Sequence, residues 1–261
     1  NVDPSRIAAS VTPRTRAVLP VHYAGHMCDM EAICDIAEKH NLLVLEDAAQ
    51  AFGASLKGKK SGSYSVAAGI SMNPMKVFGG YGEGGVVCTS DENIFSRLKR
   101  LRHAGTSSDP KKLITNDCLE ISLNHKMDTI NAALLLVALK YLPERMRIRE
   151  GIATRFNTEL PVGVQCQPIA SNETHARYVY PIRVNRRDEL RDFLEKHEVE
   201  TKIMHEPLVC DAPAYQEQKT NVPNAKKVLS ESLVIPSHEK LSVNQVSYVI
   251  NLIDEFVNTD T

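Results

Sequence analysis

The sequence predicts an α/β protein built on a largely parallel sheet. In its first half, short apolar runs alternate with stretches of helical periodicity, and strands that alternate with helices favour a parallel sheet. The run at residues 42–45 is LLVL, with no polar residue, as in a strand buried on both faces. The pattern changes beyond about residue 155, so we expect a large domain over residues 1–148 and a smaller α+β domain over residues 149–261.

Each expected element follows from its local pattern. The apolar runs predict strands at residues 17–21, 42–45, 68–72, 86–89 and 178–184. Capping residues and 3.6-residue periodicity predict helices at residues 29–39 after the cap Asp29, at 127–142 with a charged continuation to 155, at 189–197, and after the Ser242/Gln245 capping box. A further helix should bury Ile94, Phe95, Leu98 and Leu101 and stop at Gly105.

Composition excludes several classes of protein. With 31 Lys and Arg against 32 Asp and Glu, the formal net charge is −1, so nothing draws the whole chain to nucleic acid. No apolar run approaches the roughly 18 residues that a membrane span needs, and residues 1–6 lack a signal-peptide core. The six cysteines form no CxxC pair or zinc pattern. We expect free, mostly buried thiols, no metal site, and a cytoplasmic location.

Two segments of the first domain place reactive side chains next to predicted strands. Asp47 directly follows the apolar strand, where an open α/β sheet binds its ligands, although an acid there can also cap a helix. Lys76 lies between a strand and five glycines in seven residues, and such a loop lets backbone approach a ligand closely. The G-x-G-x-x-G at residues 80–85 is no dinucleotide fingerprint, because a strand-like run follows it instead of a helix.

The motifs together resemble the DegT/DnrJ/EryC1/StrS sugar aminotransferases. The resemblance rests on residues 47–50 (DAAQ), 71–76 (SMNPMK) with its glycine-rich continuation, 124–127 (NHKM), 20–25 (PVHYAG), 101–105 (LRHAG) and 205–208 (HEPL). Alone, the 124–127 segment indicates only a loop and a helix start. Members of this family are pyridoxal-phosphate (PLP) enzymes of fold type I, and the match extends across nearly the whole chain.

The resemblance implies a role for each motif. Lys76 corresponds to the Schiff-base lysine, Asp47 to the partner of the pyridine nitrogen, Gln50 to a contact of the ring hydroxyl and Ser71 to a donor for the phosphate. Asn124 corresponds to an asparagine that reaches the phosphate of the neighbouring subunit's cofactor, which would require a homodimer with shared active sites. His205 and Tyr81 are weaker candidates for the substrate side. His125 and Lys126 depart from the usual aromatic–Arg pair.

The implied reaction is transamination from glutamate or glutamine to a keto group of a nucleotide-linked sugar, in amino-sugar, surface-polysaccharide or antibiotic-sugar biosynthesis. A sugar dehydratase on the same fold is an alternative, although dehydratases have His in place of the lysine. A catalytically silent binding protein is the other. Fold type I enzymes are usually longer, with the lysine near the middle, so we expect the beginning of the large domain to be absent ahead of residue 1 and the isolated chain to be poorly soluble.

Overall fold

The computed structural model describes residues 1–106, 117–167, 171–215 and 220–259. The chain forms two compact units, one of Asn1–Pro143 with Ser171–Tyr178 and one of Glu144–Ala170 with Val179–Thr261. The domain boundary between residues 148 and 149 stays a prediction, since compactness alone does not define a unit that folds by itself. Among the described helices, none combines the length and apolarity that a membrane crossing requires.

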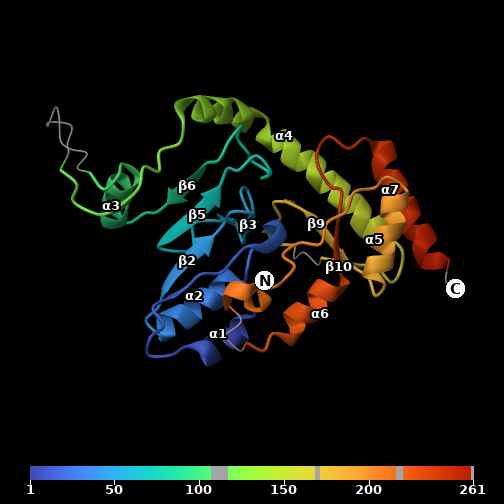
Figure 1. Cartoon of the computed structure of the whole chain (residues 1–261), viewed down its shortest axis with the longest axis horizontal. Coiled ribbons are helices and arrows are strands. Elements are labelled where there is room, and N and C mark those ends of the chain that lie inside the picture. Colours follow the sequence, from blue (N-terminus) through green and yellow to red (C-terminus); the bar gives the residue numbers. More distant parts are fainter. Residues whose placement is uncertain (107–116, 168–170, 216–219, 260–261) are drawn as a thin grey trace. The chain divides into compact units, whose positions relative to one another are not determined.

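The first unit is built on a four-stranded sheet with the strand order β1-β2-β5-β6 (Figure 1). The strands are β1 (Ala17–Val18), β2 (Leu43–Asp47), β5 (Ala67–Ser71) and β6 (Gly85–Cys88). β1, β2 and β5 run parallel, and β6 pairs antiparallel with β5. The mostly parallel sheet that the sequence predicts is therefore confirmed, with one antiparallel edge strand.

One face of this sheet is covered by α1 (Pro4–Ser10) and α2 (Met30–Lys39). Asp29 caps α2 as predicted, because its carboxylate accepts the backbone N–H of Ala32 at 3.2 Å. The core between helices and sheet consists of buried apolar side chains that include Ile7, Met27, Met30, Ile33, Ala37, Val44 and Leu56. Burying such side chains contributes about 1.5–3 kcal/mol for each large aliphatic residue.

Two burial predictions are wrong, both on the other side of the sheet. β2 is buried on one face only, through Val44 and Glu46, while Leu43 is 55% exposed. The helix α3 (Glu92–Arg102) forms where expected, and Gly105 follows it with φ +73°, but none of its residues is buried and Phe95 is half exposed. The apolar run and the helical periodicity predicted elements at these positions, but they did not show whether another element would cover the apolar side chains.

A small three-stranded sheet brings a distant segment back to the first unit. It has the order β4-β3-β8, formed by β4 (Lys59–Lys60), β3 (Ser55–Leu56) and β8 (Glu173–Thr174). Beyond β8, the backbone N–H of Ala176 donates to the Gly25 carbonyl at 3.0 Å, next to the short 3₁₀ turn η1 (Tyr23–Gly25). Residues 171–178 therefore belong to the first unit, although the chain before and after them belongs to the second.

The second unit packs three helices against an antiparallel sheet with the order β10-β9-β7. The strands are β7 (Gln165–Cys166), β9 (Tyr180–Arg183) and β10 (Ser232–Ile235), and the helices are the second half of α4 (Thr129–Glu159), α5 (Arg187–Lys196) and α7 (Val243–Asn258). Their core includes Phe156, Ile182, Leu190, Leu194, Leu233, Ile250 and Ile253. Two short turns, η2 (Val209–Asp211) and η3 (Pro213–Tyr215), and α6 (Pro223–Glu231) complete this unit.

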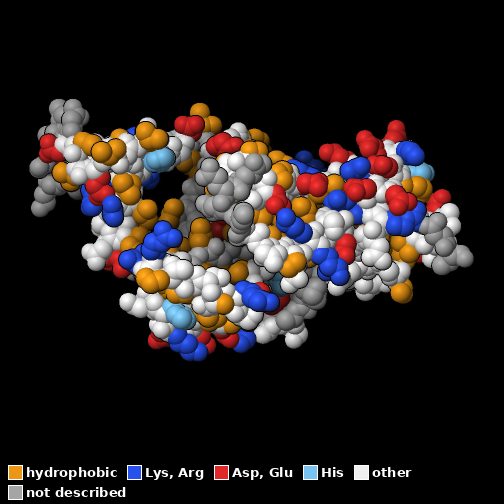
Figure 2. Space-filling view, turned by 60° about the horizontal axis from the view of Figure 1, so that its bottom comes forward, with side chains coloured by type: hydrophobic (Ala, Val, Ile, Leu, Met, Phe, Trp, Pro, Cys, Tyr) orange, Lys and Arg blue, Asp and Glu red, His pale blue; other side chains and the backbone are white. Residues whose placement is uncertain are grey.

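The predicted capping box of α7 is confirmed, since Ser242 Oγ accepts the Gln245 N–H and Gln245 Oε1 accepts the Ser242 N–H. Acidic and basic side chains are interspersed over the outer surface of this unit (Figure 2). Pairs such as Arg155–Glu159 lie one helical turn apart, a spacing at which opposite charges stabilise a helix.

The cysteines differ from the expectation of mostly buried thiols. Cys28 is buried, but Cys88 and Cys118 are exposed and the other three are half-buried. Cys88 lies on the edge strand β6, all of whose residues are exposed. Burial raises the pKa of the Cys28 thiol to about 11, which keeps it protonated and unreactive.

Candidate active site

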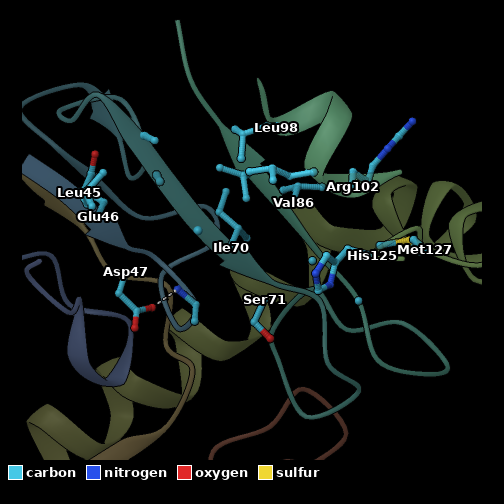
Figure 3. A pocket seen from close by; sticks show the side chains of 18 of the residues that line it. Leu45, Glu46, Asp47, Ile70, Ser71, Val86, Leu98, Arg102, His125 and Met127 are labelled. Atoms are coloured by element: carbon cyan, nitrogen blue, oxygen red, sulfur yellow. Dashed lines mark hydrogen bonds between the residues drawn. The ribbon is translucent and has the colours of Figure 1, made fainter. Parts of the chain in front are cut away.

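The candidate site lies at the carboxyl ends of two neighbouring parallel strands. Asp47 is the last residue of β2 and Ser71 is the last residue of β5, and both lie at the same edge of the sheet (Figure 3). They line a cavity of about 980 Å³ together with residues such as Gly85, Phe95, Arg102 and His125. Ligands of open α/β sheets bind at this edge, since the strand ends there leave a crevice.

The backbone of Asp47 is held by two hydrogen bonds to the segment that follows β1. Its backbone N–H donates to the Pro20 carbonyl at 3.0 Å, and its carbonyl accepts the His22 N–H at 3.1 Å. The side chain accepts the Ala49 N–H through Oδ1 at 3.0 Å. Since residues 48–50 form no helix, the helix-cap alternative for Asp47 is wrong. Oδ2 has no hydrogen-bond partner in the described part of the chain.

Lys76 lies in a tight turn after β5, and Asn73 organises that turn. Asn73 accepts the Lys76 N–H through its backbone carbonyl at 2.9 Å and the Met75 N–H through Oδ1 at 2.9 Å. Asn73 Nδ2 donates to Glu83 Oε1 at 2.7 Å, which ties the turn to the glycine-rich run behind it. The lysine is half-buried, and its Nζ lies 4.4 Å from the centre of the Tyr178 ring.

The glycine-rich run is also fixed to the first turn of α4. Asn131 is buried, and its Oδ1 accepts the Tyr81 N–H at 2.9 Å. A Cβ atom on Gly80 would lie 2.4 Å from the same Oδ1, and one on Gly84 would lie 2.8 Å from Met127 Cε. A side chain at Gly80 would therefore require the buried Asn131 to move, whereas the flexible end of Met127 can give way to one at Gly84. Tyr81 itself extends its side chain into solvent, 80% exposed.

Gln50 and Asn124 both contact other segments of the first unit. Gln50 Oε1 accepts the N–H of Ala24 at 2.7 Å, where the backbone of Ala24 has a φ of +59°. Asn124 is exposed and pairs through its backbone with His103, next to His125 on the cavity wall. His205 is an exposed residue of the second unit with a φ of +60°, followed by the cis bond to Pro207.

Sequence patterns did not reveal Tyr178 or the histidine cluster beside it. His26 and His175 stack with ring centres 5.5 Å apart, and His26 Nε2 pairs with Glu173 at 2.9 Å. Burial, together with the charges of Arg177 and His26, lowers the pKa of His175 to about 2, so this imidazole is neutral. Residues 171–178 reach the site from far along the chain, and no local signal marks such a contact.

The donor set fits PLP. A carboxylate suits a protonated pyridine nitrogen, a hydroxyl at a strand end suits a phosphate, and a lysine amine suits an aldehyde. In the described part of the chain, no group of three or more His, Cys, Asp or Glu side chains could hold a metal ion. The site therefore presents the polar groups of a cofactor enzyme on two adjacent strand ends and one turn.

Comparison with known proteins identifies the family. Residues 1–254 match the DegT/DnrJ/EryC1/StrS aminotransferase family, and the chain belongs to it. The resemblance noted from the motifs is thus confirmed, as is the fold class. The chain is 32% identical to the dTDP-3-amino-3,4,6-trideoxy-alpha-D-glucose transaminase of Streptomyces venezuelae over 98% of its length and 67% of the relative's. It is 35% identical to a "pleiotropic regulatory protein" of Geobacillus stearothermophilus, over 98% and 69%.

Solved structures agree with this assignment. The crystal structure of S. venezuelae DesV in complex with a ketimine intermediate superposes with a TM-score of 0.89 at 32% identity, covering 98% of this chain and 69% of DesV. A DegT/DnrJ/EryC1/StrS aminotransferase from Brucella abortus superposes with a TM-score of 0.87 at 28% identity, covering 93% and 65%. The chain spans about two thirds of the length of these relatives.

Proposed function

We propose that the protein is a PLP-dependent aminotransferase that transfers an amino group from glutamate or glutamine to a keto group of a nucleotide-linked sugar. The observation that carries this proposal is the placement of Asp47 and Ser71 at adjacent strand ends, with Lys76 in the turn after β5. Relatives named as a UDP-sugar aminotransferase of Pseudomonas aeruginosa and a GDP-perosamine synthase of Caulobacter vibrioides support the substrate class.

Bound PLP would supply an aldehyde for covalent capture of the amino group and an electron-accepting ring. Asp47, through Oδ2, would hold a proton on the pyridine nitrogen, because a nearby anion favours the cationic form. The Ser71 hydroxyl would donate to the phosphate. The Lys76 amine would bind the aldehyde and, once released, move a proton at the α-carbon of the amino donor. The turn built on Asn73 holds the backbone of Lys76 a few residues after the end of β5.

The remaining assignments are proposals of the same kind. Because Gln50 Oε1 is engaged by Ala24, the Gln50 Nε2 would be the donor to the ring hydroxyl. Asn124, exposed ahead of α4, would reach the phosphate of a second copy's cofactor, which makes a homodimer the functional form. Tyr81 and His205 would face the substrate. We propose the cytoplasm as the location, since exposed thiols such as Cys88 persist in reducing compartments.

Borohydride trapping tests the central assignment. Wild-type protein incubated with PLP and reduced with borohydride should carry the cofactor on the peptide containing Lys76, and Lys76→Ala should carry none. Lys59→Ala is a matched control, because Lys59 also lies over a tyrosine ring, that of Tyr64, at 5.2 Å. Trapping at another lysine, or equal trapping in Lys76→Ala, would show the assignment to be wrong.

A turnover assay separates the competing functions. An aminotransferase converts glutamate or glutamine to the keto acid when a keto-sugar nucleotide is present. A dehydratase would consume the sugar without an amino donor, and Lys76 argues against it. The regulatory name of the Geobacillus relative keeps a silent binding protein as the second candidate, and such a protein would bind PLP or the nucleotide sugar without turnover.

A further inference from the structure

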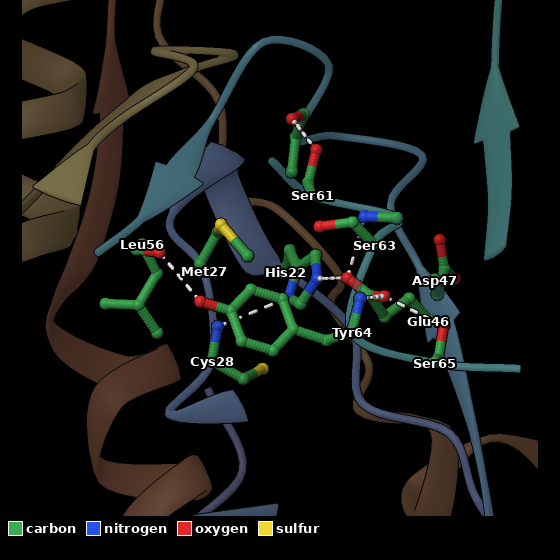
Figure 4. A network of polar contacts seen from close by, with 12 residues as sticks. His22, Met27, Cys28, Glu46, Asp47, Leu56, Ser61, Ser63, Tyr64 and Ser65 are labelled. Atoms are coloured by element: carbon green, nitrogen blue, oxygen red, sulfur yellow. Dashed lines mark hydrogen bonds and ion pairs between the residues drawn. The ribbon is translucent and has the colours of Figure 1, made fainter. Parts of the chain in front are cut away.

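A fully buried carboxylate lies next to Asp47 on the opposite face of β2. Glu46 is 1% exposed and His22 is 0% exposed, and His22 Nε2 lies 3.0 Å from Glu46 Oε2 (Figure 4). Glu46 also accepts the backbone N–H of Gly62 at 2.8 Å and of Tyr64 at 2.9 Å, and the Ser65 hydroxyl lies 2.8 Å from Oε1. Each carboxylate oxygen thus has two donors.

The hydrogen bonds also fix where the proton on His22 lies. His22 Nδ1 accepts the backbone N–H of Cys28 at 3.2 Å, so the ring proton is on Nε2 and is donated to Glu46. Every partner of Glu46 is then a donor, which favours the ionised carboxylate. Burial by itself raises the pKa of Glu46, but the hydrogen bonds from His22, Gly62, Ser65 and Tyr64 outweigh it and lower the pKa below its ordinary value.

This network joins the three segments that carry the candidate site. His22 holds Glu46 through its ring and Asp47 through its backbone N–H, so one residue fixes both neighbours on β2. Residues 62–65, bound to Glu46, lead directly into β5, which ends at Ser71 and continues to Lys76. Successive strand residues point to opposite faces, so the side chains of Glu46 and Asp47 extend from opposite faces of β2, and that of Glu46 is fully buried.

We propose that Glu46 and His22 are positioning residues for Asp47, setting its carboxylate in line with the pyridine nitrogen of bound PLP. The proposal rests on the proposed function. A charge-assisted N–H···O bond is typically about 2.7–2.9 Å long, so a shift of β2 away from the ring would lengthen and weaken it. A second His–carboxylate pair in the same unit, between His26 and Glu173 at 2.9 Å, serves for comparison.

A double-mutant cycle on PLP affinity tests the proposal. Glu46→Gln places an amide N–H against the donors that bind the Glu46 carboxylate. It should weaken PLP binding about tenfold when Asp47 is present, but less than about threefold in an Asp47→Asn background. Equal losses in both backgrounds would show that Glu46 acts only on folding, and would overturn the inference. The control Glu173→Gln should change PLP affinity less than about twofold; a loss as large as that of Glu46→Gln would also overturn it.

Variants of His22 keep the test decisive if Glu46→Gln folds poorly. His22→Gln retains an N–H donor for Glu46 and should keep PLP affinity within about threefold of wild type, whereas His22→Leu should lose about tenfold. Loss of affinity in both variants, at matched thermal stability, would refute a positioning role. If wild-type protein binds no PLP, both the proposed function and the inference are refuted. If wild-type protein binds PLP but the variants do not behave as described, only the inference is refuted.

Discussion

Replacing Gly80 by alanine should destabilise the first unit through a single contact. The added methyl would lie 2.4 Å from Asn131 Oδ1 and 3.1 Å from its Cγ, whereas ordinary contacts begin near 3.4 Å. Asn131 must therefore retreat by about 1 Å in a closely packed site, and its 2.9 Å bond to the Tyr81 N–H breaks. Overpacking costs about 1–3 kcal/mol, and losing this part-buried hydrogen bond costs a further ~1 kcal/mol.

We therefore expect Gly80→Ala to lower the free energy of unfolding by about 2–4 kcal/mol, measured by urea denaturation with circular dichroism. Gly82→Ala is the matched control, because a methyl there meets no atom within 4 Å. It should leave stability unchanged or raise it by up to about 1 kcal/mol. The turn of Lys76 should also shift in Gly80→Ala, since the Gly80 N–H donates to the Met72 carbonyl at 2.8 Å.

The pair Gly80→Ala and Asn131→Ala separates the clash from other effects. Removing the Asn131 side chain also removes the clash, so Asn131→Ala should cost at least about 1 kcal/mol less in the Gly80→Ala background than in wild type. Additive losses, or a Gly80→Ala variant as stable as Gly82→Ala, would refute the steric argument.

Three further predictions concern single side chains. The pKa of His175 in the folded state, about 2, lies below its ordinary value of 6.5. The unfolded state therefore binds the proton first, and the free energy of unfolding falls by up to about 1.4 kcal/mol for each pH unit below 6.5. His175→Asn should flatten that slope in unfolding measurements, and an unchanged slope would contradict the prediction. Tyr178→Leu should raise the acetylation rate of Lys76 about two- to fivefold, because an aromatic ring stabilises an ammonium group by ~0.5–1 kcal/mol. Tyr178→Phe keeps the ring and should leave the rate unchanged. Peptide mass spectrometry measures the acetylation rate in both variants. Iodoacetamide should modify exposed Cys88 and leave buried Cys28 unmodified in the folded protein, whereas rapid alkylation of Cys28 would show that its burial is wrong.

Local signals predicted the elements well, because caps and periodicity act within a few residues. The Asp29 cap and the Ser242/Gln245 box both form as predicted. Burial was harder to predict, because periodicity identifies the apolar face of a helix such as α3 without showing what covers it. The strand-end placement of Asp47 followed from the order of apolar runs and turns.

The contacts around the site could not be predicted in the same way. Tyr178 meets Lys76 and His22 meets Glu46 only after distant segments come together, and no spacing in the sequence encodes those pairings. Gln50 shows the same limit, since its bond to Ala24 depends on an unusual backbone conformation at a residue far from it. Residue type indicated the chemistry of the site, but tertiary pairing decides which atoms are available.

The return of residues 171–178 to the first unit has a consequence for how the protein is made. During synthesis the ribosome produces Lys76, the whole of α4 and β7 before it produces Tyr178. The strand β8 and the ring beside the lysine can join the first unit only after that interval. Such non-local closure slows folding, so we expect the nascent first unit to remain open around Lys76 until part of the second unit has also been synthesised.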